Sequence, residues 1–174
     1  WNAGDVNYRD TDGNGIVEPG NNTLANPGDR SVIGNSSLRY RFGINIDLRY
    51  KNWSLNTFFQ GILKGDYFPP TGNWNAFWPW NAGNAEWYYI TDSWSPTNRD
   101  AYFPGPHIGY NDKKNYSVND RYLQDASYIR LKQLTLNYKV PADIVSQIGV
   151  RSLNIYYSGQ NLWDATNMRA PLDP

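Results

Sequence analysis

The chain has 174 residues, and its 16 basic and 16 acidic side chains give a formal net charge of zero at pH 7. This balance argues against a nucleic-acid-binding protein, which normally carries a basic excess, and the absence of cysteine excludes disulfide scaffolds, cysteine-ligated metals and thiol catalysis. The sequence has no run of about 18 apolar residues, so it predicts no transmembrane helix. Membrane-spanning β-strands stay compatible with this composition, because their residues alternate between apolar and polar. The chain opens at Trp1 without a Met or a signal peptide, so we expect a segment of a longer protein.

Near the N-terminus, the sequence from Asp10 to Glu18 follows the spacing of a calcium-binding loop. The candidate ligands are the side chains of Asp10, Asp12 and Asn14, the backbone carbonyl of Ile16, and Glu18 directly or through water. Position 12 of the pattern is Asn21 instead of the usual glutamate, and no helices are expected to flank the loop, which excludes an EF-hand domain. Two interpretations stay open: a loop that binds Ca²⁺, or a loop held by its own side-chain to backbone hydrogen bonds.

A strict alternation of polarity runs from Ser37 to Tyr50. Every even position is apolar or aromatic, and every odd position is polar or glycine. This pattern predicts a β-strand with one apolar and one polar face. Fourteen residues at about 3.3 Å each cover roughly 33 Å when the strand is tilted by about 45°, which is enough to cross a bilayer core. Tyr40 and Tyr50 lie near its ends, as the interfacial aromatic residues of such strands do.

A second alternating run, 53–63, follows after the two-residue connection Lys51-Asn52, which predicts an antiparallel hairpin. A third run, 125–140, changes phase at Lys132-Gln133, which indicates a β-bulge. Pro141 ends this run.

After Pro141, a single helical turn is expected at Ala142 to Ile148, followed by a fourth strand at 150–161. The short connections therefore fall at one end of the strands. The long segments 1–35, 64–121 and 162 onward fall at the other end.

The connection 64–121 is far longer than the median of about 4 to 6 residues and holds five of the eight tryptophans. Its aromatic cluster consists of Trp74, Phe77, Trp78, Trp80, Trp87, Tyr88 and Tyr89. These rings would either stack on sugar faces of a substrate or touch a lid, or they would pack on one another to order the loop.

Short turns at one end and long loops at the other are typical of outer-membrane barrels. We therefore predict an all-β fold, an antiparallel transmembrane β-barrel segment of about four strands with long extracellular loops. Four strands cannot close a membrane barrel, so the segment would belong to a larger one. The alternative is a secreted carbohydrate-binding β-sandwich, which shows the same alternation but usually has shorter strands.

His107 is the only histidine and lies in a Pro- and Gly-rich stretch. No Ser/His/Asp order, phosphate loop, histidine-based zinc motif or paired-carboxylate signature occurs. We therefore expect a protein that is not an enzyme and that requires no cofactor, with Ca²⁺ as the one ion that a motif suggests.

Several collinear stretches resemble the C-terminal barrel region of the SusC/RagA-type TonB-dependent outer-membrane transporters of Bacteroidetes. They are GDVNY at 4–8 running into DTDGNG at 10–15, IGN at 33–35 with FG at 42–43, WSL at 53–55 with FFQG at 58–61, DSWSP at 92–96, and DASYIRLK at 125–132 with LTL at 134–136, followed by SGQNL at 158–162. Each stretch alone is weak, but together they span nearly the whole chain.

The resemblance implies a barrel of about 22 strands with an N-terminal plug, set in the bacterial outer membrane and in contact with its lipid. It also implies a SusD-like surface lipoprotein as partner, and import of an oligosaccharide or a peptide with energy passed on by TonB. The plug and the TonB contact would lie in an N-terminal region that this sequence lacks. Residues 1–174 would be the C-terminal part of the barrel, with 1–35 and 64–121 outside the cell. The charged residues of the first strand, Arg39, Arg41, Asp47 and Arg49, would face the lumen and bond to the plug or to a ligand.

Overall fold

The computed structural model describes residues 2–70, 86–106, 115 and 117–174. The chain divides into two units, which are described separately. One contains Trp1–Gly34 with Phe68–Leu123, and the other contains Asn35–Tyr67 with Gln124–Pro174. Neither helix of the described residues is long and apolar enough to cross a membrane.

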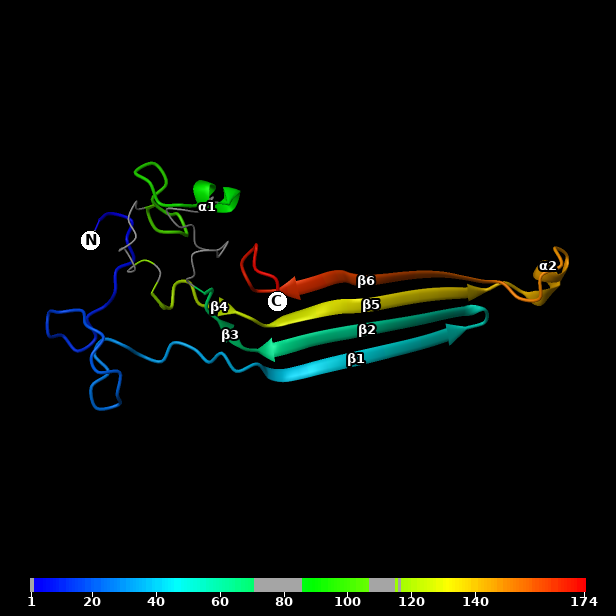
Figure 1. The fold of residues 1–174 in the computed structure, drawn as a ribbon, viewed down its shortest axis with the longest axis horizontal. Coiled ribbons are helices and arrows are strands. Elements are labelled where there is room, and N and C mark those ends of the chain that lie inside the picture. The colour runs from blue at the N-terminus through cyan, green and yellow to red at the C-terminus, as the bar shows by residue number, and fades with distance from the viewer. Residues whose placement is uncertain (1, 71–85, 107–114, 116) are drawn as a thin grey trace. The chain divides into compact units, whose positions relative to one another are not determined.

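The second unit is built on a four-stranded antiparallel sheet with the order β1-β2-β5-β6 (Figure 1). Its strands are β1 (Arg39–Tyr50), β2 (Trp53–Lys64), β5 (Tyr128–Lys139) and β6 (Asn154–Thr166). The first three agree closely with the predicted runs, and Lys51 takes the positive φ that the two-residue turn between β1 and β2 requires. The β1–β2 hairpin predicted from the sequence is confirmed, since Tyr50 pairs with Trp53 and the register continues to Arg39 and Lys64.

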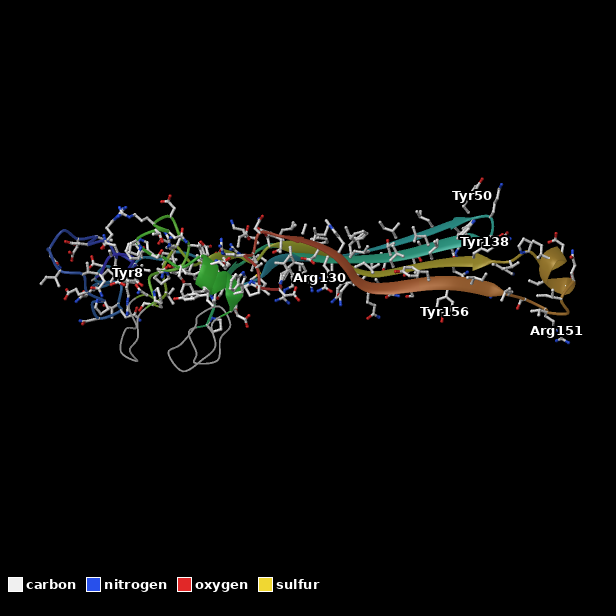
Figure 2. All side chains as sticks on the ribbon, turned by 90° about the horizontal axis from the view of Figure 1, so that it is seen from above. Tyr8, Tyr50, Arg130, Tyr138, Arg151 and Tyr156 are labelled. Atoms are coloured by element: carbon white, nitrogen blue, oxygen red, sulfur yellow. The ribbon has the colours of Figure 1, made fainter. Side chains whose placement is uncertain are left out.

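The register separates the residues of the sheet into an apolar and a polar face. Ile44 pairs with Phe59, Phe59 with Leu131 and Leu131 with Trp163, so one row of the apolar face is apolar across all four strands. In a row of the other face, Asp47, Asn56, Thr135 and Ser158 follow one another. Figure 2 shows the same division, since Tyr50 and Tyr138 project from one side of the sheet and Tyr156 from the other.

A bulge crosses the sheet at one level and confirms the phase change predicted at Lys132-Gln133. Phe58 and Phe59 of β2 face Gln133 and Leu131, so Lys132 is an extra residue of β5. On β6 two residues, Asn161 and Leu162, lie between the partners of Gln133 and Leu131. The number of inserted residues at this level therefore rises from none in β2 to one in β5 and two in β6.

The predicted end of the fourth strand at residue 161 is wrong, because β6 continues through the bulge to Thr166. Asn161 has a φ of +49°, a conformation that Asn tolerates better than most residues. Gly159 leaves room for the displaced side chain of Leu162, since a Cβ atom there would lie 2.7 Å from its Cδ2. Residues 162–166, predicted as part of a long loop, are strand instead.

The base of the long connection is closed by a two-residue ladder that the sequence did not predict. In it β3 (Asp66–Tyr67) pairs with β4 (Gln124–Asp125). At the opposite end of the sheet, the predicted helical turn forms as α2 (Ala142–Ser146). Its connection is fastened to the strands by the bond from the Val140 N–H to the Leu153 carbonyl, 2.9 Å long.

The first unit is ordered around a small aromatic core. Phe103 and Tyr122 are almost completely buried, and the ring of Phe103 lies 5.0 Å from those of Tyr89 and Tyr102. Tyr89 belongs to α1 (Trp87–Thr91). Burial raises the pKa of Tyr122 to about 12, and its hydroxyl donates to the carbonyl of Tyr102 at 3.1 Å.

The N-terminal segment joins this core through backbone and side-chain contacts. The N–H of Val6 donates to the side-chain oxygen of Asn115 at 2.8 Å, and the amide of Asn115 donates to Asp5 at 2.9 Å. Trp94 packs so closely on Gly4 that a Cβ atom there would lie 2.5 Å from the indole. The motifs GDVNY and DSWSP therefore meet in one folded unit.

The β-sandwich alternative requires a second sheet of similar size, packed about 10 Å from the first. In the described part of the chain, the only other sheet is the two-residue ladder of β3 and β4. The apolar face of the long strands is correspondingly exposed, with 57% of Leu48 and 58% of Ile155 accessible. The architecture is all-β, with one long sheet instead of a sandwich.

Candidate functional site

The four charged residues predicted to face a lumen are Arg39, Arg41, Asp47 and Arg49. All four lie on the polar face of β1, the face that also carries Gln60 and Ser54 of β2. Asp47 accepts a hydrogen bond from the Asn56 amide at 2.7 Å. Within the described chain, no hydrogen bond or ion pair is formed by the side chain of Arg41 or Arg49, although both residues pair with β2 in the backbone ladder. That these residues face a lumen stays a prediction at this point.

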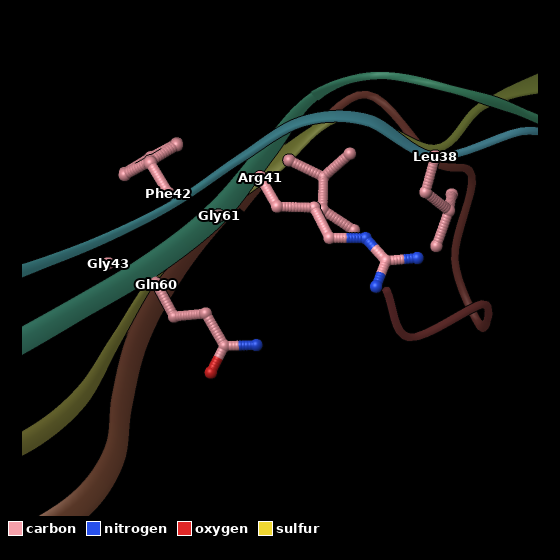
Figure 3. A pocket seen from close by; sticks show the side chains of 7 residues that line it. Leu38, Arg41, Phe42, Gly43, Gln60 and Gly61 are labelled. Atoms are coloured by element: carbon pink, nitrogen blue, oxygen red, sulfur yellow. The ribbon is translucent and has the colours of Figure 1, made fainter.

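A cavity of about 490 Å³ lies near the start of β1, lined by Arg41, Gly43, Gln60 and Ile62 of the polar face and also by Leu38, Phe42 and Gly61. In Figure 3 the side chains of Arg41 and Gln60 extend on the same side of the ribbon, beside the bare backbone of Gly43. Gln60 also donates to the hydroxyl of Tyr128 at 3.2 Å. A guanidinium and an amide at one hollow can together bind a carboxylate or a sugar hydroxyl.

A second cavity, of about 570 Å³, lies at the short-turn end of the sheet. Arg49, Lys51 and Lys139 line it together with hydroxyl and amide side chains, which belong to Ser54, Asn52, Asn137 and Asn154. No local pattern in the sequence singles out Lys139. It is brought beside Arg49 only by the β1-β2-β5 strand order, a feature that alternation alone does not reveal.

Arg130 is a further residue of the polar face, and no local pattern in the sequence marks it as a site residue. Its side chain is 13% exposed and pairs with the carboxylate of Asp173. The guanidinium lies 5.7 Å from the ring centre of Tyr128. The pair joins residues 43 positions apart, so no local sequence signal marks it.

Two carboxylates of the predicted calcium loop, Asp10 and Asp12, form a cluster with Asp29, and one oxygen atom of each lies within 4.8 Å of the others. Asp10 accepts hydrogen bonds from the N–H groups of Gly13 and Gly15, both 2.7 Å long. The bond from Gly15 is the main reason why the pKa of Asp10 lies below its ordinary value. The loop therefore brings together oxygen groups of the kind that Ca²⁺ prefers.

Asp29 lies beside Asp10 and Asp12, although the calcium-loop pattern of the sequence does not include it. It accepts bonds from the N–H groups of Thr11 at 2.6 Å and Glu18 at 2.8 Å, and the bond from Thr11 is the largest cause of its lowered pKa. Glu18 therefore enters this network through its backbone, and its carboxylate is not part of the three-residue cluster.

The remaining candidate ligands of the loop are engaged locally. The side chain of Asn14 bonds to the N–H of Ile16 at 2.8 Å and to Asp12 at 3.0 Å. The structure therefore contains the hydrogen bonds of the second interpretation, in which the loop is held by bonds from its own side chains to its backbone. Calcium binding stays a prediction.

The aromatic cluster of the long connection is described only in part. Trp74, Phe77, Trp78 and Trp80 lie outside the described residues, as does His107. Trp87 is 75% exposed. The rings of Tyr88 and Tyr89 lie 5.9 Å and 5.0 Å from that of Phe103, so two members of the cluster contribute to the aromatic core. A contact of these rings with a substrate or a lid stays a prediction.

No family model matches the chain. Two curated relatives from Formosa agariphila do: TonB-dependent receptor P3 is 31% identical over 160 residues, and TonB-dependent receptor P26 is 28% identical over 161 residues. Both alignments cover 92% of this chain but only 14% and 15% of the relatives, so the chain spans about a seventh of their length.

Two solved structures are similar in fold. They show the RagAB peptide importer in its open-open and closed-closed states, and each matches with a TM-score of 0.52 and 20% sequence identity. The matches cover 78% of this chain and 14% of the solved chains.

Proposed function

Because the chain belongs to the SusC/RagA-type TonB-dependent receptors, which are proteins of the bacterial outer membrane, we propose that its four-stranded sheet is a transmembrane segment of a larger plugged barrel. TonB-dependent receptors are not enzymes, in agreement with the expectation from the sequence. The complete protein would import an oligosaccharide or a peptide across the outer membrane.

The observation that carries this proposal is the two-faced sheet. The apolar face of β1 is continuous from Phe42 to Tyr50, a stretch of nine residues, which matches the length of about 9 to 11 residues that a tilted strand needs to cross a membrane. Tyr50, Trp53 and Tyr138 lie side by side at the short-turn end of the apolar face, and the rings of Trp53 and Tyr138 are 4.6 Å apart. Such a row fits the aromatic girdle of an outer-membrane barrel.

The edges of the sheet support the same interpretation. β1 and β6 are its outer strands, and each has a row of backbone N–H and C=O groups that no strand of the described residues pairs. In a membrane those groups must bond to further strands, because an open edge is not tolerated in hydrocarbon. The polar face would then line the lumen, and segments 1–35 and 64–121 would lie outside the cell.

The partners follow from this assignment. A SusD-like surface lipoprotein would bind at the extracellular end as the second subunit of a SusCD-like complex. TonB would act through an N-terminal region outside this sequence. Lipid of the outer membrane would contact Ile44, Leu48 and the other residues of the apolar face.

Gene deletion tests the transport role. In a bacterium that carries the complete gene, we expect deletion to abolish growth on either oligosaccharides or peptides as the sole carbon source. The complete gene should restore growth, whereas a version without the TonB-contacting region should not. Affinity purification of the tagged transporter should retain a surface lipoprotein. Unchanged growth on both substrate classes after deletion refutes the proposed function.

A further inference from the structure

Charge is divided unevenly between the two faces of the long sheet. The paired positions of the apolar face, from Phe42–Tyr50 across to Ile155–Ala165, carry no charged side chain. The paired positions of the polar face carry six cations and two acids, which are Arg39, Arg41, Arg49, Lys64, Arg130 and Lys139 against Asp47 and Asp164. Asp173 pairs with Arg130 and lowers the excess from four positive charges to three. The whole chain, by contrast, has no net charge.

Three of the six cations line the two cavities of the sheet. Arg41 lines the cavity near the start of β1, and Arg49 and Lys139 line the cavity at the short-turn end. Neither lining includes an aspartate or a glutamate. Asp47, the acid of the same strand, is already bonded to Asn56 at 2.7 Å.

Neutral donors and acceptors surround these cations. Seven amide side chains occupy polar-face positions: Asn45, Asn56, Gln60, Gln133, Asn137, Asn154 and Gln160. Side-chain amides both donate to and accept from hydroxyl groups, whereas guanidinium groups bind carboxylates through two parallel N–H bonds. An acidic sugar presents both groups together.

We propose that the polar face binds a carboxylate-bearing oligosaccharide, so that the transporter imports an acidic glycan such as an oligouronate. The inference rests on the proposed function, since the polar face must line the transport path. An extended peptide is the less suitable ligand, because its backbone N–H and C=O groups also need partners. The backbone groups of β2 and β5 are already used in the sheet ladder.

Calorimetric titration of the complete purified transporter tests the inference. The probes are a galacturonate trimer, a galactose trimer of the same length, and a glutamate trimer. We expect the galacturonate trimer to bind more tightly than the galactose trimer and to weaken at high salt. Arg41→Gln and Arg49→Gln should each lower its affinity about tenfold and leave the galactose trimer unaffected.

Arg9→Gln is the matched control, because it removes an exposed cation from the N-terminal segment instead of the sheet and should change no affinity. The unfolding midpoints of all three variants should equal that of the unmodified protein. Unchanged galacturonate affinity in both sheet variants overturns the inference, as does binding of the glutamate trimer alone. If a neutral glycan is bound and imported while the acidic one is not, only this inference fails. If no probe binds and gene deletion leaves growth unchanged, both this inference and the proposed transport function fail.

Discussion

Replacing Ile44 by arginine tests directly whether the apolar face of the sheet contacts lipid. Ile44 lies two residues from Ile46, the midpoint between Phe42 and Tyr50. Two residues correspond to a depth change of only about 5 Å in a strand tilted by about 45°. Arginine at the midplane of a membrane strand costs about 2 to 4 kcal/mol and less toward the interfaces. We therefore expect Ile44→Arg to lower the free energy of unfolding by about 2 to 3 kcal/mol.

The neighbours of Ile44 offer the new charge no compensation. Its row across the sheet continues through Phe59 and Leu131 to Trp163, without a carboxylate or an amide. Asn45→Arg is the matched control, because Asn45 is the next residue of the same strand and belongs to the polar face. It should cost less than about 1 kcal/mol.

The assay is reversible unfolding of the complete transporter in lipid vesicles, measured by denaturant titration. Equal costs for Ile44→Arg and Asn45→Arg would show that the two faces meet the same environment and would refute a lipid-facing strand. A transporter that stays soluble at high concentration without detergent would contradict it as well.

Three further outcomes follow from the structure. Gly61→Ala should destabilise the transporter by about 1 to 3 kcal/mol, because the new Cβ atom would lie 2.5 Å from the ring of Phe42 and closer still to a backbone carbonyl. In the same denaturant titration Gly43→Ala should cost less, because a Cβ atom there would lie 3.0 Å from the side chain of Phe58 and no closer than 3.9 Å to a backbone oxygen. If the N-terminal loop binds Ca²⁺, calorimetric titration of the transporter should show a binding isotherm that Asp12→Ala removes, and identical traces for both proteins would contradict a metal site. The lowered pKa values of Asp10 and Asp29 mean that their stabilising effect is complete above the ordinary carboxyl pKa of about 4 and is lost as the pH falls through the lowered values. The hydrogen-exchange protection factors of the N–H groups that donate to these carboxylates should therefore fall only in acid, and a protection factor that falls already near neutral pH would refute this linkage.

The long strands could be predicted because one face is apolar and the other polar along most of their length. In β1 the alternation is unbroken from Arg41 to Tyr50, and the structure keeps every one of these residues in register with β2. The Lys51-Asn52 turn was equally clear, since two residues between alternating runs leave few geometries. Local signals of this kind depend on neighbours in the chain and need no knowledge of distant partners.

The cavities and the carboxylate cluster depend on distant partners and could be predicted only in part. Arg41 and Arg49 were selected from their own strand, but Lys139 reaches Arg49 through the strand order. Asp29 lies 19 positions from Asp10 in the sequence and reaches it by accepting hydrogen bonds from the backbone N–H groups of Thr11 and Glu18, on both sides of the loop. Neither partner stands at a spacing that a motif defines.

The stepwise bulge explains both the success at β5 and the error at β6. One inserted residue, Lys132, reverses the parity of β5, so the phase change is visible in the sequence. Two inserted residues in β6 leave its parity unchanged, so that Tyr157 and Trp163 occupy the same face. The only sequence sign of this insertion is the polar Asn161 at an apolar position, which resembles the end of a strand.

At the level of the bulge, β2 has no inserted residue, β5 has one and β6 has two. The sheet is therefore longer on the β6 side than on the β2 side, and this difference bends the sheet at that level while its apolar face stays continuous. The bend requires a residue that accepts positive φ, at Asn161, and a neighbour without a side chain, at Gly159. The stretch SGQNL supplies both within five residues. Its resemblance to the transporter family therefore has a local physical basis, because a barrel wall must curve without turning its lipid-facing residues toward the lumen.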